Sequence, residues 1–95
     1  MQATAAAAAA FAVEKPWRLN PQVALRDESF GALAYHYGNR RLVFLKSRLM
    51  VELVTVLGDY PSAAEAIAAV VPEAQRRAYE RALARLAASE VIDAR

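Results

Sequence analysis

The chain contains no cysteine, and this absence removes several classes of function. A protein without cysteine has no disulfide bond, no thiolate metal ligand and no cysteine nucleophile. The composition fits a reducing compartment, and we expect the protein to be cytoplasmic. His36 is the single histidine, and one histidine without a cysteine cannot form a structural zinc site. We therefore expect no metal ion and no other cofactor.

Signs of catalysis are also missing from the sequence. The three glycines lie far apart, so there is no glycine-rich phosphate loop. No serine lies in a G-x-S-x-G motif. The carboxylates are scattered over expected turns and helix starts, where capping and solvation explain them. We expect a protein that is not an enzyme.

Long apolar runs are absent as well. No run approaches the ~18 residues that cross a bilayer, so we expect no membrane partner. Residues 5–10 are all alanine, but no charged side chain precedes them and the run has no leucine, which argues against a signal peptide. We expect residues 1–15 to be an alanine-rich flexible tail, with a helix docked on a partner as the alternative. Residues 16–95 then form one small domain.

Three short β-strands are predicted in the first half of this domain. We expect strands over residues 22–26 and 32–37, an acidic turn with a glycine between them, and a third strand that ends at Leu45. Gly38 and Asn39 are expected to form a two-residue hairpin loop, with the glycine at positive φ. Three pairs of residues then lie opposite each other, namely Tyr37 and Arg40, Tyr35 and Leu42, and Leu33 and Phe44.

This register divides the side chains between the two faces of the sheet. The six paired residues share one face, and four of them are large and apolar, so we expect this face to cover the helices. On the opposite face lie Ala32, Ala34, His36, Arg41, Val43 and Leu45. His36 is accordingly expected to be a surface or half-buried residue, with a pH-sensing role as the alternative.

Three helices are predicted after the strands. Ser47 is the expected N-cap of the first helix, and Gly58 is expected to end it in the left-handed conformation. Ser62, three residues before a glutamate, opens the second helix with a capping box. The third helix is expected to begin near Pro72 and to end at about Ser89. The apolar residues at helical spacing are Met50, Leu53, Val54 and Leu57, then Ile67 and Val71, then Tyr79, Leu83 and Leu86.

The expected fold class is therefore α+β, with a three-stranded antiparallel sheet followed by a three-helix bundle in a winged helix-turn-helix-like arrangement. The third strand is the last of the sheet, so we expect it to be an edge with unpaired N–H and C=O groups. An edge of this kind can capture a peptide by strand addition. A proline at Val43 is the substitution by which we would expect to remove an edge N–H group.

Basic residues gather in two places, although the net charge is only +2. The first group flanks the third strand and consists of Arg40, Arg41, Lys46 and Arg48. The second recurs every four residues along the third helix and consists of Arg77, Arg81 and Arg85. This stripe is either a solvated helix face or a surface for an acidic partner. A row of small side chains beside it, Ala74, Ala78 and Ala82, would allow a close neighbour, although alanine is also the best helix former.

Several local motifs resemble a known family over residues 16–92. They are Trp17-Arg18-Leu19, Pro21-Gln22-Val23-Ala24-Leu25-Arg26, Phe30-Gly31-Ala32-Leu33, Tyr35-His36, Arg40-Arg41-Leu42 and Phe44-Leu45-Lys46. Together with the order of strands and helices, they resemble the PqqD-like peptide-recognition domain, or RiPP recognition element, and more narrowly the mycofactocin precursor-peptide chaperones. Asp27 stands where such relatives carry a proline, which changes a turn.

The resemblance implies a non-catalytic peptide chaperone. It would bind the acidic leader of the mycofactocin precursor peptide and present it to a radical SAM maturase that carries iron–sulfur clusters. The leader would add as a fourth strand beside the third strand and lie against the third helix. On this basis the expected peptide-binding residues are Arg41, Leu42, Val43, Phe44, Leu45, Ala78, Arg77, Arg81 and Arg85. We expect a monomer or weak dimer that has no nucleic-acid partner.

Two other functions remain as alternatives at this point. A winged-helix nucleic-acid-binding protein would have a related shape, and the arginine stripe could follow phosphates; its binding would fall steeply with salt. A pure interaction module would pair the open edge with a second copy of the chain, and its sedimentation would depend on concentration.

Overall fold

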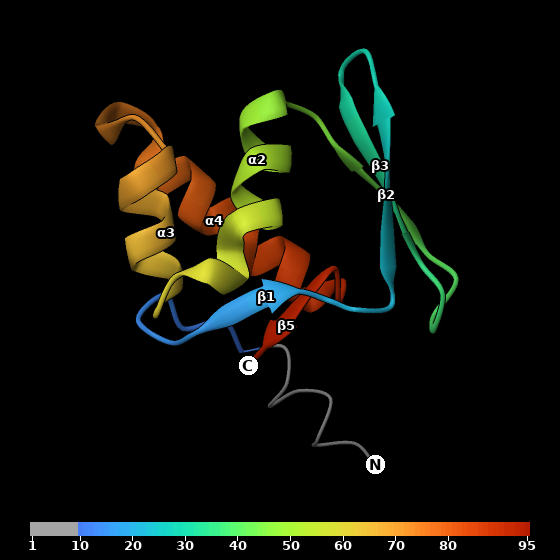
Figure 1. The fold of residues 1–95 in the computed structure, drawn as a ribbon, viewed down its shortest axis with the longest axis horizontal. Helices are drawn as coiled ribbons and strands as arrows, with labels where there is room; N and C mark the ends of the chain where they lie inside the picture. Colours follow the sequence, from blue (N-terminus) through green and yellow to red (C-terminus); the bar gives the residue numbers. More distant parts are fainter. Residues whose placement is uncertain (1–9) are drawn as a thin grey trace.

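The computed structural model describes residues 10–95, and these form two antiparallel sheets and three α-helices (Figure 1). In chain order the elements are β1 (Trp17–Leu19), β2 (Val23–Glu28), β3 (Gly31–His36), β4 (Leu42–Leu45), α2 (Arg48–Val56), α3 (Ala63–Val70), α4 (Arg76–Ala88) and β5 (Ile92–Ala94). Short 3₁₀ turns, Leu57–Asp59 and Glu73–Gln75, follow α2 and precede α4. The α+β class, with a three-stranded antiparallel sheet and three helices, is confirmed. The second sheet, in which β1 pairs with β5, is an addition to the prediction.

The larger sheet has the strand order β2-β3-β4, so β4 lies at an edge among the described residues. Tyr35 pairs with Leu42 and Leu33 pairs with Phe44, as the predicted register requires. The ladder between β2 and β3 runs to the ends of both strands, so their turn is only residues 29–30 and is shorter than predicted.

The two faces of this sheet are the reverse of the prediction. Ala32, Ala34 and Leu45 are buried toward the helices, whereas Leu42 and Phe44 lie on the exposed face. The reason is steric, because the small alanine side chains let α2 pack closely against β3. Large apolar side chains on the other face were therefore a poor guide to which face is buried. Figure 1 shows the helices on one side of the sheet.

The loop between β3 and β4 also differs from the predicted two-residue hairpin. The N–H of His36 donates to the carbonyl of Arg41 (3.0 Å), and the N–H of Arg40 donates to the carbonyl of His36 (2.8 Å). The loop thus spans residues 37–40, and Arg40, at φ 65°, is its left-handed residue. Gly38 is not at positive φ; an added Cβ there would lie 2.8 Å from Cε1 of His36, so the position requires glycine for the close approach of that ring.

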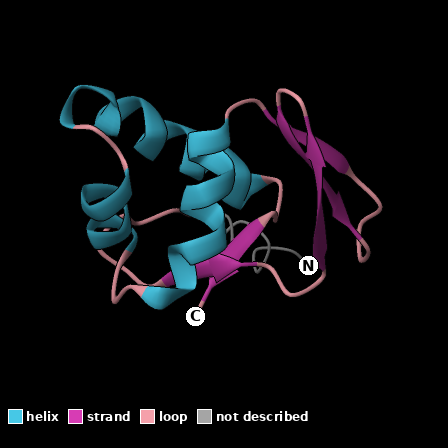
Figure 2. Ribbon diagram, turned by 45° about the horizontal axis from the view of Figure 1, so that its top comes forward, coloured by secondary structure: helices cyan, strands magenta, loops and turns pink. Residues whose placement is uncertain are grey.

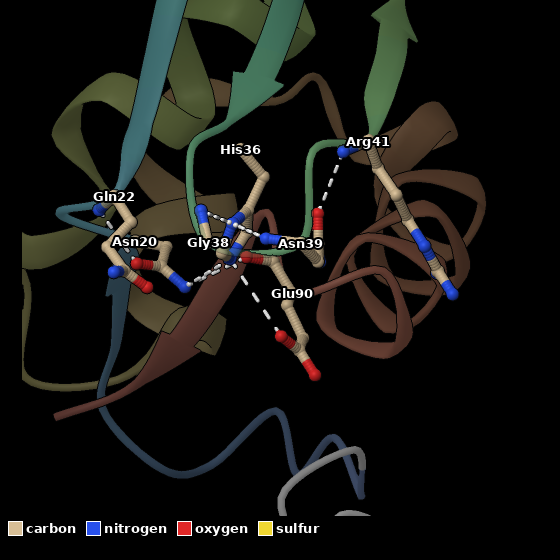
Figure 3. Close-up of polar contacts among 7 residues, drawn as sticks. All are labelled: Asn20, Gln22, His36, Gly38, Asn39, Arg41 and Glu90. Carbon is tan, nitrogen blue, oxygen red and sulfur yellow. Dashed lines mark hydrogen bonds and ion pairs between the residues drawn. The ribbon is translucent and has the colours of Figure 1, made fainter.

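His36 is buried, with 3% of its surface exposed, because it lies on the face that covers the helices. The prediction of a surface or half-buried residue is wrong. Its Nδ1 accepts hydrogen bonds from the N–H groups of Gly38 (2.9 Å) and Asn39 (3.1 Å) (Figure 3). Asn20 Nδ2 lies 3.3 Å from this Nε2 and donates to the carbonyl of Glu90 (3.0 Å). The cluster joins the loop before β4 to the end of α4.

The predicted helix starts are confirmed at two serines. Ser47 Oγ accepts the N–H of Met50 (3.0 Å) at the start of α2, and Ser62 Oγ accepts the N–H of Glu65 (3.1 Å) at the start of α3. The predicted left-handed end at Gly58 is wrong. That glycine is not at positive φ, and α2 instead continues into the 3₁₀ turn.

The N-terminal side of the domain is held by Trp17, which is buried. Its indole Nε1 donates to the carbonyl of Ala12 (2.9 Å), and its ring centroid lies 5.0 Å from that of Phe11. Of the tail expected over residues 1–15, residues 1–9 lie outside the described residues, and the segment that follows Phe11 contacts the domain. The pairing of β1 with β5 escaped prediction because both strands have only three residues.

Gly31 begins β3 and lies directly beside the end of β4. Its φ is +152°, and an added Cβ would collide with the carbonyl oxygen of Leu45. Both features restrict the position to glycine. This close approach aligns β3 and β4, and it shows that the carbonyl of Leu45 points toward β3.

We predict that Gly31→Ala lowers the free energy of unfolding by about 2 kcal/mol or more, because the new methyl group adds backbone strain and a steric clash. Gly58→Ala is the matched control, since its Cβ would make only an ordinary contact of 3.4 Å with Cβ of Arg18 and its φ is not positive. Urea denaturation followed by circular dichroism measures both. Equal stability of the two variants would contradict the role assigned to Gly31.

Candidate functional site

A groove of about 560 Å³ lies between β4 and α4. One wall is formed by Val43 to Leu45 of β4 and by Lys46 directly after it, and the other is the face of α4 that carries Ala78, Ala82 and Arg85. The alanines leave space that larger side chains on α4 would fill. Met50 of α2 also lines the groove. The groove is therefore open on one side and bounded by a strand edge and a helix.

Tyr79 fixes one end of this groove. Its hydroxyl lies 2.9 Å from Oγ of Ser47, the residue that caps α2. Because Ser47 also accepts the N–H of Met50, the contact links α4 to the first turn of α2. This link holds the helix wall at a set distance from the end of β4.

The hydrogen bonding of β4 alternates between its two sides. His36 donates to the carbonyl of Arg41, so the pairs two and four residues further on, at Val43 and Leu45, are also the hydrogen-bonded pairs of the antiparallel ladder. The intervening residues, Leu42 and Phe44, direct their N–H and C=O groups away from β3. The open edge is thus formed by the main chain of these two residues.

This pattern corrects one sequence-based inference. Val43 uses its N–H within the sheet, because it belongs to a hydrogen-bonded pair with Ala34. A proline at Val43 would therefore disrupt the domain itself. The N–H at the open edge that lies beside the groove is that of Phe44.

The side chains of β4 also alternate, but between the two faces of the sheet, at right angles to the main-chain hydrogen bonds. Val43 and Leu45 point toward the helices and line the groove. Leu42 and Phe44 have their side chains on the exposed face of the sheet. A strand added to this edge would place every second side chain in the groove and the others on the exposed face.

The structure gathers only part of the predicted site. Val43, Phe44, Leu45, Ala78 and Arg85 all line the groove. The main chain of Arg41 and Leu42 continues the strand beyond it.

The arginine stripe divides between two sides of α4. Arg85 lines the groove, whereas Arg77 lies with Glu73 and Glu80 on the side that faces α3. Arg81 is exposed and does not line the groove. Residues four apart differ by about 40° around a helix, so eight residues turn the side chain by about 80°. A spacing of four therefore cannot keep all three arginines on one groove.

Some lining residues were absent from the predicted site. Lys46, Ser47, Met50, Tyr79, Ala82 and Leu86 also line the groove. The row of alanines on the third helix was the signal for Ala82. Met50, Tyr79 and Leu86 were expected in the core, and their periodicity does not distinguish a core residue from one at the base of a groove.

The charged residues that line the groove, Lys46 and Arg85, are both basic. Each is exposed, so neither requires a buried counter-ion. A ligand with carboxylates would complement this end of the groove. Within residues 10–95 there is no group of histidine, aspartate and glutamate side chains suited to hold a metal ion. No helix in that range is both long enough and apolar enough to span a membrane.

Comparison with known proteins identifies the family. Residues 16–93 match the Peptide chaperone MftB family. The chain is 45% identical over 89 residues to the peptide chaperone MftB of Mycobacterium ulcerans, covering 93% of this chain and 82% of the relative. It is 44% identical over 92 residues to that of Mycobacterium tuberculosis (96% and 84%), and 49% identical over 77 residues to that of Mycolicibacterium smegmatis (80% and 76%).

No solved structure matches the chain. The relatives bear the name peptide chaperone, which agrees with the expectation that this protein is not an enzyme. The match runs from β1 into β5 and includes both walls of the groove. The chain belongs to the Peptide chaperone MftB family.

Proposed function

We propose that this protein is a peptide chaperone that binds the leader of the mycofactocin precursor peptide and presents it to a radical SAM maturase. The names of the relatives support the peptide chaperone role. The observation that carries the mode of binding is the open edge of β4 beside a groove. In this proposal the leader becomes the fourth strand of the sheet.

The main chain of the leader pairs with Leu42 and Phe44. Their N–H and C=O groups face away from β3, and within residues 10–95 no strand pairs with that side of β4. Main-chain hydrogen bonds of this kind give affinity that depends little on the ligand's sequence. They also hold the leader extended, which sets the spacing at which its side chains meet the domain.

The groove selects among extended peptides. Alternate leader side chains point into the groove, where Val43 and Leu45 of β4, Met50 of α2 and Leu86 of α4 offer apolar surface. The small side chain of Ala82 leaves room for them. Burying apolar side chains here contributes roughly 25 cal/mol per Å² of area removed from water. We therefore expect apolar residues at every second position of the bound segment.

Charge completes the recognition. Lys46 and Arg85 border the groove and would meet leader carboxylates. Arg77 and Arg81 are exposed on α4 outside the groove, where they act on an acidic peptide at longer range and speed its approach. The protein supplies binding and orientation, and the chemical step belongs to the maturase.

We predict that Phe44→Pro weakens binding of the leader peptide about ten-fold relative to Phe44→Ala. Both variants lose the same exposed ring, but only proline removes the N–H that faces the leader, and its ring obstructs the incoming main chain. Fluorescence anisotropy of a labelled leader peptide measures the affinity, and circular dichroism verifies that both variants are folded.

Equal leader affinity of the two folded variants would rule out strand addition at β4. Sedimentation at the same protein concentration is measured in parallel, and a monomeric parent is expected. If the parent and Phe44→Ala dimerise and Phe44→Pro does not, the edge pairs with a second copy of the chain instead.

We also predict that Arg85→Glu weakens leader binding about ten-fold at low salt, whereas Arg77→Glu changes it less than three-fold. The two substitutions alter net charge equally, but only Arg85 lines the groove. Leader titrations at two salt concentrations separate a direct contact with an arginine from long-range attraction, because salt screens the long-range attraction. A larger effect at Arg77 would place the leader elsewhere on α4.

A further inference from the structure

The exposed face of the three-stranded sheet carries a second feature that the groove does not explain. The large apolar residues that are most exposed are Phe30 (41%), Phe44 (56%), Leu42 (60%) and Tyr37 (62%). All four belong to this sheet or its two turns, on the side away from the helices. In Figure 2 no segment of residues 10–95 covers that side of the sheet. Contiguous apolar surface of this kind marks an interaction site.

The aromatic side chains on this face are already ordered by one another. The rings of Phe30 and Phe44 lie 5.6 Å apart, and those of Tyr35 and Tyr37 lie 5.1 Å apart in an edge-to-face arrangement. Aromatic side chains held in this way lose little conformational freedom when a partner covers them. Tyrosine and phenylalanine are also enriched in protein interfaces.

The rim of this face is basic. Arg26 lies on β2, Lys46 directly follows β4 and also lines the groove, and Arg40 closes the loop at one end. Among the described residues of this face the carboxylate is Glu28, and its pairing with Arg26 (3.1 Å) offsets the charge of that arginine. The net positive charge of the rim therefore comes from Arg40 and Lys46. A partner that fits is apolar at its centre and carries carboxylates around it.

We propose that this face, defined by Phe30, Leu33, Tyr35, Tyr37, Leu42 and Phe44, is the docking surface for the maturase. The identity of the partner rests on the proposed function, whereas the surface rests on its own exposure and charge. A second copy fits poorly, because two copies related by a two-fold axis would bring their basic rims together.

Continuity with the leader site favours the maturase over other partners. A leader strand at β4 would extend the same sheet, and its outward side chains would lie beside Leu42 and Phe44. An enzyme docked on this face would therefore contact both the domain and the leader. The groove on the opposite face stays free, so the two ligands bind together.

The test compares substitutions on the two faces. Phe30→Ser with Tyr37→Ser removes exposed rings that lie outside the groove lining. Ala82→Arg fills the groove and leaves the exposed face intact. Calorimetry with the purified maturase and anisotropy with the labelled leader measure the two affinities. We expect the double variant to bind the maturase at least ten-fold more weakly than the parent does and to bind the leader within two-fold of the parent. We expect Ala82→Arg to bind the leader at least ten-fold more weakly and the maturase within two-fold of the parent.

A charge reversal adds a second arm. Arg40→Glu, on the rim, is expected to weaken maturase binding at least five-fold, and Arg77→Glu, on α4, less than two-fold. Unchanged maturase affinity in the double variant would overturn the inference. The inference would also fail if the parent forms a dimer that the double variant alone does not form. It would fail too if the parent binds phosphatidylglycerol vesicles and the double variant alone does not.

The inference and the proposed function fail in different ways. If the parent binds the maturase through this face but does not bind the leader, the docking surface stands and the proposed function falls. If the leader binds in the groove but substitutions on the exposed face leave maturase affinity unchanged, the proposed leader site stands and the docking surface falls.

Discussion

The main-chain groups of Leu42 and Phe44 that face away from β3 are the constraint on which the site depends. Buried amide groups are almost always paired, and an edge strand leaves its outer row to water or to a ligand. The domain keeps this row accessible, because β4 is last in the sheet order and α4 stands back from it across the groove. A peptide strand is the partner that satisfies such a row along its length.

Small side chains make this arrangement possible on both sides of β4. On β3, Ala32 and Ala34 let α2 pack against the sheet, which anchors the strand next to β4. On α4, Ala78 and Ala82 keep the helix wall low where the groove runs. Larger residues at the first pair would separate helix and sheet, and at the second pair would fill the space proposed for the leader.

Much of the architecture follows from local patterns in the sequence. The serine caps, the register of β3 and β4 and the edge position of β4 all depend on short-range rules, and these hold. The buried face does not follow from such rules. Side-chain size favoured the face with Leu33 and Phe44, whereas close packing selected the face with alanines and His36.

The site was predictable to a similar extent. The strand residues and Ala78 could be chosen because an edge strand and a row of alanines are visible in the sequence. Arg77 and Arg81 lie outside the groove, since a spacing of four residues drifts around a helix and the rotation of α4 is fixed by tertiary packing. The contact of Tyr79 with Ser47 joins residues far apart in the chain, so no local pattern announces it.

Amide hydrogen exchange in the free protein and with the leader bound tests the central claim most directly. In the free protein the amides of Val43 and Leu45 should exchange slowly, because they bond to β3, and those of Leu42 and Phe44 should exchange fast. Adding the leader peptide should slow Leu42 and Phe44 at least ten-fold. Fast exchange of both amides with the leader bound, or slow exchange of both in the free protein, would contradict the account.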